Sequence, residues 1–181
     1  MKTKNLLMMF LLTSIFVFSQ NKESSTRKFI DEAQFTRINK DWTTMASFKS
    51  GIGEYVRFFP IEVINLKSGE KTKALQVNMF IKKPDVYKTA WVGLEEINEF
   101  VTFIETHVIP NLGLEFKNKS SEFIFRANEM TLNFKVFNKD RRLTINLNSY
   151  DEDDELDIYT FWTETQVDKI PNLLKILKKI K

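Results

Sequence analysis

Residues 89–100 read TAWVGLEEINEF, and within this stretch the apolar pattern changes from that of a strand to that of a helix. Alternation ends at Trp91, and the following apolar side chains recur at steps of three and four residues, which places them on one side of a helix. These residues are Leu94, Ile97, Val101, Ile104 and Val108. Pro110 cannot donate a backbone hydrogen bond and disfavours helical geometry in the residue before it, so we expect the helix to end there.

Strands are expected on the N-terminal side of this helix. The apolar period is close to two over four segments, residues 42–48, 54–66, 72–82 and 87–92. Within 72–82, Gln76 and Asn78 alternate with apolar residues, which is typical of a half-buried antiparallel strand. Gly69 can adopt the positive φ that a hairpin loop needs, so we expect a turn between the second and third segments.

The C-terminal half repeats this organisation. Apolar and polar residues alternate over 123–127, 132–136 and 143–147, and a further run at 156–162 leads into a helix with Pro171 in its first turn. We therefore predict an α+β fold, with a large antiparallel meander sheet, flat or partly rolled, and two amphipathic helices packed on one face.

Two short similarities indicate an internal duplication of a strand-strand-strand-strand-helix unit. Thr-Ala-Trp at 89–91 and Thr-Phe-Trp at 160–162 precede the two helices, and Ile-Pro-Asn-Leu occurs at 109–112 and at 170–173. The halves would be 41–112 and 113–181. Because the Ile-Pro-Asn-Leu segments lie at opposite ends of their helices, coincidence stays open as the alternative.

The first segment has the layout of a secretory leader. Lys2 and Lys4 precede an apolar run at 6–18, and the small residue Ser19 precedes polar residues. The run is shorter than the roughly 20 residues of a membrane-spanning helix, so a retained anchor is the weaker alternative. We expect cleavage near Ser19 and an exported, soluble product in the periplasm or outside the cell.

Three segments follow from this interpretation: a signal peptide at 1–19, a flexible polar leader at 20–28 and a single α+β domain at 29–181. Loss of Lys2 and Lys4 lowers the formal charge from +3 to +1. A nearly neutral protein has no overall field that attracts polyanions, so we expect neither nucleic acid nor a membrane as a partner.

The composition excludes several kinds of chemistry. The chain has no cysteine and one histidine, which rules out disulfides, thiolate nucleophiles and multi-histidine metal sites. An acidic run at 151–157 is the strongest charge cluster, but Leu156 and Trp162 occupy positions where an EF-hand needs Gly and Glu. We expect no metal and no cofactor, and a solvated hairpin end is favoured over a nonstandard calcium loop.

Catalytic side chains are not expected, although His107 and the pair Glu95 and Glu99 are candidates. His107 lies in the last turn of the first helix, where its charged form complements the helix dipole, and no serine elbow accompanies it. Glu95 and Glu99 share a helix face at a spacing of four residues, so a carboxylate-dependent hydrolase that uses these acids is the alternative to a binding protein.

The terminal helix is rich in lysine and carries an apolar stripe. Such a helix suits a membrane-surface adaptor, but its stripe also has a sheet to cover, and cations in its last turns complement the helix dipole. We favour docking on the sheet.

Aromatic residues are the feature that suggests a ligand. The candidate ligand-binding residues are Trp42, Trp91, Tyr159 and Trp162, and we expect Tyr159 and one tryptophan to face outward and line a pocket. The predicted function is that of a non-enzymatic binding or protein-interaction domain. Its partner would be a small apolar ligand, a glycan or an envelope protein.

A resemblance adds to this interpretation. The signal ending in Phe-Ser-Gln at 18–20, the antiparallel sheet, the segment 89–100 and the lysine-rich closing helix together resemble small exported proteins of unknown function from Bacteroidetes-type bacteria. This resemblance implies residence in the periplasm or on the outer surface, and it supplies no functional residue.

Overall fold

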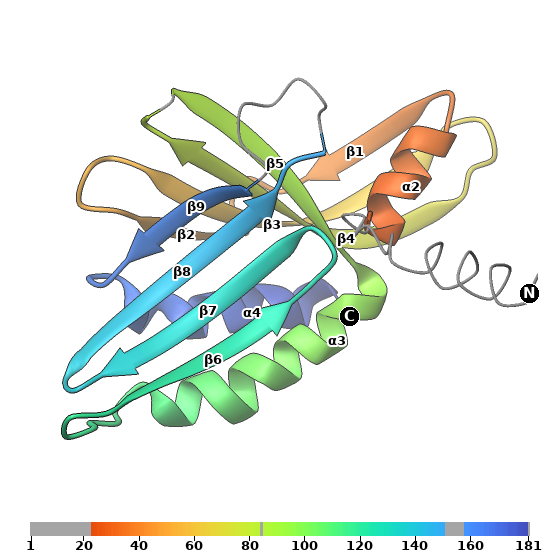
Figure 1. The fold of residues 1–181 in the computed structure, drawn as a ribbon. Coiled ribbons are helices and arrows are strands. Elements are labelled where there is room, and N and C mark those ends of the chain that lie inside the picture. Colours follow the sequence, from red (N-terminus) through yellow and green to blue (C-terminus); the bar gives the residue numbers. More distant parts are fainter. Residues whose placement is uncertain (1–22, 84, 151–157, 181) are drawn as a thin grey trace, which may run out of the picture.

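A computed structural model describes residues 23–83, 85–150 and 158–180 of the chain. It shows two antiparallel sheets and, in the described part, three α-helices, so the predicted α+β fold is confirmed (Figure 1). The strands form separate sheets of five and four strands, and these do not close into a barrel. No helix among the described residues is long and apolar enough to cross a bilayer.

Sheet A contains the first five strands, in which β1 and β2 both pair with β3, followed by β4 and β5. The strands are β1 (Thr36–Lys40), β2 (Ala46–Lys49), β3 (Tyr55–Asn65), β4 (Lys71–Ile81) and β5 (Val86–Gly93). The β3–β4 hairpin turns at Gly69, whose φ is +77°, as the sequence predicted.

Sheet B is a simple meander in chain order. It consists of β6 (Ser120–Arg126), β7 (Met130–Phe137), β8 (Asp140–Asn148) and β9 (Ile158–Thr163). Its alternating burial places one apolar face toward the core and leaves the other face to solvent.

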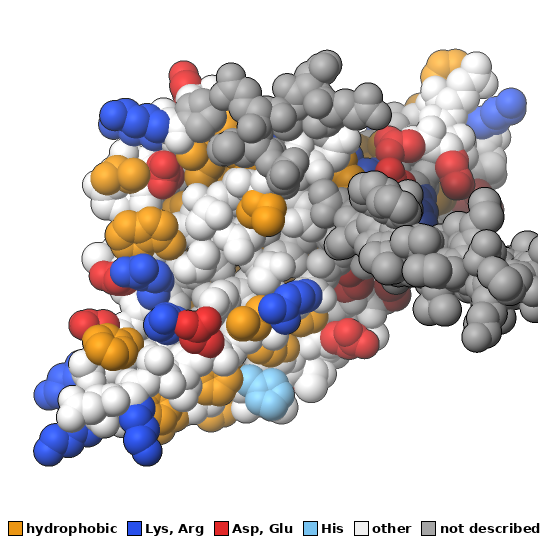
Figure 2. Space-filling model, viewed as in Figure 1, with side chains coloured by type: hydrophobic (Ala, Val, Ile, Leu, Met, Phe, Trp, Pro, Cys, Tyr) orange, Lys and Arg blue, Asp and Glu red, His pale blue; other side chains and the backbone are white. Residues whose placement is uncertain are grey.

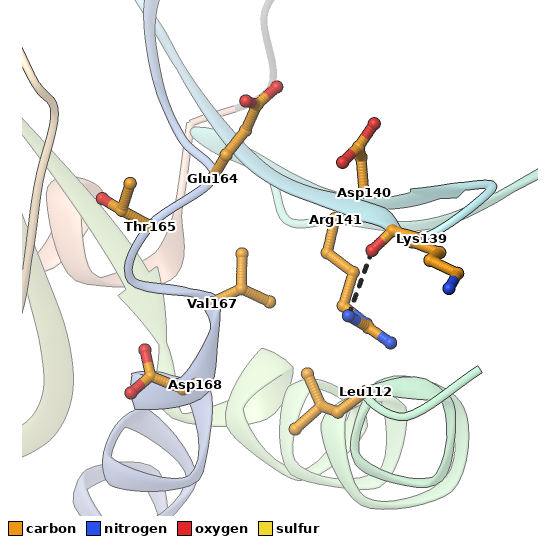
Figure 3. Close-up of a pocket in the computed structure, with 8 residues that line it drawn as sticks. All are labelled: Leu112, Lys139, Asp140, Arg141, Glu164, Thr165, Val167 and Asp168. Atoms are coloured by element: carbon orange, nitrogen blue, oxygen red, sulfur yellow. Dashed lines mark hydrogen bonds between the residues drawn. The ribbon is translucent and has the colours of Figure 1, made fainter. Parts of the chain in front are cut away.

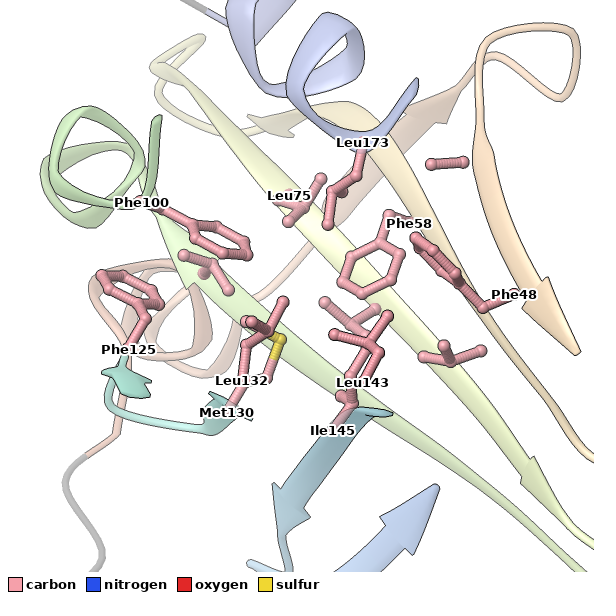
Figure 4. Close-up of a cluster of buried hydrophobic side chains, with 14 of the residues drawn as sticks. Phe48, Phe58, Leu75, Phe100, Phe125, Met130, Leu132, Leu143, Ile145 and Leu173 are labelled. Atoms are coloured by element: carbon pink, nitrogen blue, oxygen red, sulfur yellow. The ribbon is translucent and has the colours of Figure 1, made fainter. Parts of the chain in front are cut away.

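Helices α3 (Leu94–Phe103) and α4 (Ile170–Ile180) lie side by side on the same face of sheet A, which confirms their predicted packing (Figure 1). Together with sheet B they enclose the main core. Its large side chains come from all four parts and include Phe58, Leu75, Phe100, Leu132, Ile145 and Leu173 (Figure 4). Burial of these side chains is the main source of stability.

The predicted first helix is α-helical only as far as Phe103. A π-helical turn, η1 (Ile104–Val108), and a 3₁₀ turn, η2 (Ile109–Asn111), complete it. The amide of Ile109 donates to the carbonyl of Ile104, and Pro110 has no amide to continue the ladder. A second 3₁₀ turn, η3 (Val167–Lys169), precedes α4 and places Pro171 in its first turn.

The expectation of a flexible leader at 20–28 is wrong for its described part. Helix α2 (Ser25–Glu32) begins there, and the Ser24 hydroxyl accepts a hydrogen bond from the amide of Arg27 as an N-cap. Phe29 and Ile30 of α2 pack on the face of sheet A opposite α3 and α4. The polar sequence did not show where this helix begins, because its partners lie far away in the chain.

The two halves of the chain share one strand order. Strands β2 to β5 form a meander that leads into α3, and β6 to β9 form a meander that leads into α4. Ile-Pro-Asn-Leu follows the π-turn in the first half and opens the helix in the second. The shared order is what a duplication requires, and the duplication stays a prediction.

Candidate functional site

The face of sheet A that points away from α3 and α4, here called the outer face, carries three rows of side chains across neighbouring strands. Strand register places alternate residues of β3, β4 and β5 on this face. The rows are Phe59–Gln76–Trp91, Arg57–Asn78–Thr89 and Tyr55–Phe80–Tyr87. A polar row therefore lies between two rows that contain aromatic rings.

The row Tyr55–Phe80–Tyr87 consists of three aromatic rings that contact one another. The ring centroids of Phe80 and Tyr87 are 4.6 Å apart, and those of Tyr55 and Phe80 are 5.5 Å apart. Tyr87 is 69% exposed, so its ring is available for contact. A hydrogen bond with the Tyr55 side chain raises the pKa of Tyr87, so the phenol of Tyr87 stays neutral at ordinary pH.

Gln76 lies between Phe59 and Trp91 in its row and has an unused acceptor. Its Nε2 donates to Asn78 Oδ1 at 2.9 Å, and the Thr89 hydroxyl donates to the same oxygen at 3.3 Å. Gln76 is only 8% exposed, yet its Oε1 has no hydrogen-bond partner among the described residues. Buried amide oxygens normally accept a hydrogen bond, and this one belongs to a residue that lines a pocket.

Arg27 and Tyr150 border these rows on one side and are here called the wall, and a buried carboxylate holds this wall in place. Glu129, in the β6–β7 turn, is fully buried and accepts from both Nε (2.9 Å) and Nη2 (2.8 Å) of Arg27. It also accepts from the amide (3.1 Å) and hydroxyl (2.7 Å) of Ser24 and from the amide of Trp91 at 3.0 Å. One side chain thus ties α2 and β5 to sheet B.

Tyr150 continues the wall. The Arg27 guanidinium lies 4.6 Å from its ring centroid, and the Tyr150 hydroxyl donates to the carbonyl of Asn128 at 3.0 Å. Burial, followed by the negative charge of Glu129, raises the pKa of Tyr150 to about 12. This phenol therefore stays protonated and supplies an aromatic surface.

Between α2, this wall and the rows lies a pocket of about 530 Å³, here called the outer-face pocket. Its lining includes Arg27, Gln76, Tyr87, Thr89, Trp91 and Tyr150. Its size is within the range of small-molecule sites, and it combines aromatic rings with a few placed polar groups.

The structure separates the four predicted ligand-binding residues. Trp91 lines the outer-face pocket, where it is 9% exposed. Trp42 is exposed next to Phe59, at 5.2 Å between ring centroids, and does not line this pocket. Trp162 lies on the solvent face of sheet B, with the Arg142 guanidinium 4.7 Å from its ring.

The expected outward orientation of Tyr159 is wrong. Tyr159 is 3% exposed and belongs to the main core. Side chains alternate along β9, so Tyr159 and Phe161 point inward, whereas Trp162 points outward. Figure 2 views sheet B from its solvent face, where apolar side chains are scattered among charges of both signs. That face does not form an aromatic platform.

The catalytic candidates do not form a reaction centre in the described part of the chain. His107 is exposed on η1, and its nearest aromatic neighbour is Phe103, at 6.0 Å between ring centroids (Figure 2). Glu95 and Glu99 are exposed, and Glu95 accepts a hydrogen bond from the Ser25 hydroxyl at 2.7 Å. None of these side chains lines the outer-face pocket.

Glu96 is the acid of this helix that the structure singles out. Burial, partly offset by backbone hydrogen bonds, raises its pKa, and the charges of Glu95 and Glu129 act in the same direction as burial. Its two carboxylate oxygens accept from the amides of Asn128 (2.7 Å) and Gly93 (2.9 Å). Glu96 therefore caps α3 and ties it to the β6–β7 turn.

A second pocket, of about 550 Å³, lies between the β7–β8 turn and the start of α4 (Figure 3). It is lined by polar residues with Leu112 and Val167, and it has no aromatic ring. Arg141 donates to the carbonyls of Lys139 and Leu114, and Glu164 accepts from Arg142. The Nε of Arg141 is buried and has no hydrogen-bond partner among the described residues. Because this pocket lacks an aromatic surface to hold a ligand, it is the weaker candidate.

The acidic run at 151–157 lies outside the described residues. Within the described residues no group of three or more histidine and acidic side chains is placed to hold a metal. No family model matches the chain, and no curated protein matches it either.

The residues that build the outer-face pocket were largely missed by sequence analysis. Gln76 was recognised only as a polar residue of a half-buried strand, and Glu129 was not singled out. The available signal was that an amide alternates with apolar residues in the middle of a long strand. Arg27 carried no signal, because its role depends on Glu129, which lies 102 residues further along the chain.

Proposed function

We propose that this protein is an exported binding domain that holds a small ligand in the outer-face pocket and carries out no reaction. The observation behind the proposal is the buried Oε1 of Gln76, which lacks a donor next to Trp91. An unpaired buried acceptor costs about 1–3 kcal/mol, so a ligand that donates to it recovers free energy on binding.

The ionisable groups at the pocket support binding rather than catalysis. Arg27 is paired with Glu129, and the phenol of Tyr150 titrates far above neutral pH. General acid or base catalysis needs a group whose pKa lies near the working pH and whose proton can reach the substrate.

The two alternatives receive less support. The hydrolase would use Glu95 or Glu99, which are solvated, while the partly buried Glu96 is engaged by two amides. The membrane-surface adaptor would display the apolar stripe of α4, but Leu173 and Leu177 of that stripe are fully buried against the core.

The proposal is tested by nuclear magnetic resonance of the isotope-labelled protein against a fragment library with neutral, cationic, anionic and apolar members. We expect at least one fragment to shift the signals of Gln76 and the Trp91 indole. If no fragment shifts these signals, or if shifts gather at the pocket of Figure 3, the proposed site is wrong.

A further inference from the structure

The chemistry of the outer-face pocket restricts the class of ligand, and the inference that follows rests on the proposed function. Gln76 Oε1 needs a hydrogen-bond donor. This oxygen is already buried without a partner, so an aliphatic ligand would leave that cost in place, and an anion that offers only acceptors would be repelled by it. A ligand with hydroxyl or N–H groups is the one that gains free energy here.

The charges around the pocket disfavour a cationic donor. Arg57 stands in the polar row with its guanidinium 4.1 Å from the Tyr55 ring. Lys88 borders the pocket, but its ammonium lies on the other face of sheet A, 4.9 Å from the Tyr159 ring centroid. Asp31 is the acid on the rim, and the charge of Arg27 is already matched by Glu129. A neutral donor meets no repulsion from these groups.

The aromatic rings supply the other half of the recognition. The face of an aromatic ring is electronegative and attracts positively polarised C–H groups. Tyr87 offers such a face at the surface, whereas Trp91 is nearly buried and forms the floor. A molecule with C–H groups on one side and hydroxyls at its edge satisfies both the rings and Gln76.

The spacing of the rows indicates the length of the ligand. Trp91 and Tyr87 lie on the same face of β5, four residues apart, which corresponds to about 13 Å along the strand. Asn78 and Thr89 lie between them. One sugar ring could contact Gln76 above Trp91 while the next reaches Tyr87.

We propose that the outer-face pocket binds a neutral oligosaccharide, with a hydroxyl donating to Gln76 Oε1 and a C–H face of a neighbouring sugar on Tyr87.

The test is a titration of the purified protein with neutral disaccharides (cellobiose, maltose and N,N′-diacetylchitobiose), their monosaccharides, glucuronic acid and the apolar dye anilinonaphthalene sulfonate. Binding is followed by the Trp91 indole signal and by calorimetry. We expect at least one neutral disaccharide to bind, and to bind at least fivefold more tightly than its monosaccharide.

Variants locate the contact. Gln76→Ala is expected to weaken disaccharide binding about tenfold and Tyr87→Ala about fivefold. Trp162→Ala is the matched control, since this exposed aromatic lies on the other sheet and should not alter binding. Tyr87 is also largely exposed, so Tyr87→Ala keeps the test valid if Gln76→Ala fails to fold.

The possible failures are distinguishable. If only glucuronic acid or the dye shifts the Trp91 signal, the proposal of a neutral saccharide ligand is wrong, but the proposal that the outer-face pocket binds a ligand is supported. If none of these probes shifts it, and no member of the fragment library does, both proposals are wrong. Disaccharide binding that is lost in Trp162→Ala and kept in Tyr87→Ala would also overturn the inference.

Discussion

Glu129 does more than any other single side chain to position the site. It is fully buried, and five hydrogen bonds reach its two oxygens from Ser24, Arg27 and Trp91. A carboxylate in such a place is stable only while these donors remain. The geometry of the Arg27 wall therefore depends on a residue that does not itself line the pocket.

Glu129→Ala is expected to lower the free energy of unfolding by about 2–4 kcal/mol, because it leaves the donors of Ser24, Arg27 and Trp91 unpaired. Urea denaturation measures the change. Glu122→Ala is the control, since its ion pair with Lys135 is exposed and should contribute little. Equal effects of the two variants would show that Glu129 is not a structural centre.

Glu96 predicts a pH dependence of stability. Its pKa is raised in the folded state, so its contribution is fully present below the unfolded pKa, near 4.5, and is lost as pH rises through the folded pKa. Glu96→Gln should remove this fall in unfolding free energy as the pH rises above about 4.5. Glu99→Gln, at an exposed position of the same helix, should keep it, and the reverse result would refute the assignment.

At the scale of single elements, the sequence predicted most strands and both long helices correctly because their apolar periods are regular. The start of helix α2 was not predicted, because its stabilising contacts are to sheet A and to Glu129 and its own residues are mostly polar. The π-helical turn was not predicted, because Pro110 indicates where the helix ends but not that its last turn is wider than an α-helical turn.

The packing of α4 gives a prediction at this scale. Leu173→Ala should lower the free energy of unfolding by about 2–5 kcal/mol, since a fully buried leucine leaves a cavity. Lys175→Ala, on the exposed side of α4, should leave the unfolding free energy nearly unchanged. The intact protein should not float with anionic vesicles, and flotation would show that the apolar stripe is released to a membrane.

At the scale of the whole molecule, the fold class followed from alternation and the strand-to-helix change, but the division into two sheets did not. The alternation of apolar residues within a strand does not indicate which strands pair with each other. No residue pattern showed that β5 and β6 belong to different sheets. The outer-face pocket was hidden for the same reason, since it joins α2, sheet A and the segment after β8.

The signal peptide proposed at residues 1–19 gives a prediction about the whole chain. Expressed with residues 1–19 in a Gram-negative host, the protein should be recovered outside the cytoplasm with Gln20 as its first residue. N-terminal sequencing of the exported fraction provides the measurement. A chain that keeps Met1, or that stays in the cytoplasm, would contradict the proposed export.

The most direct measurement is a crystal structure of the protein soaked with the neutral disaccharide that binds best. The account predicts density along β5, with a sugar hydroxyl within hydrogen-bonding distance of Gln76 Oε1 and a sugar face on Tyr87. Density confined to Trp162 on sheet B or to the pocket beside Arg141, with the outer face of sheet A empty, would contradict it.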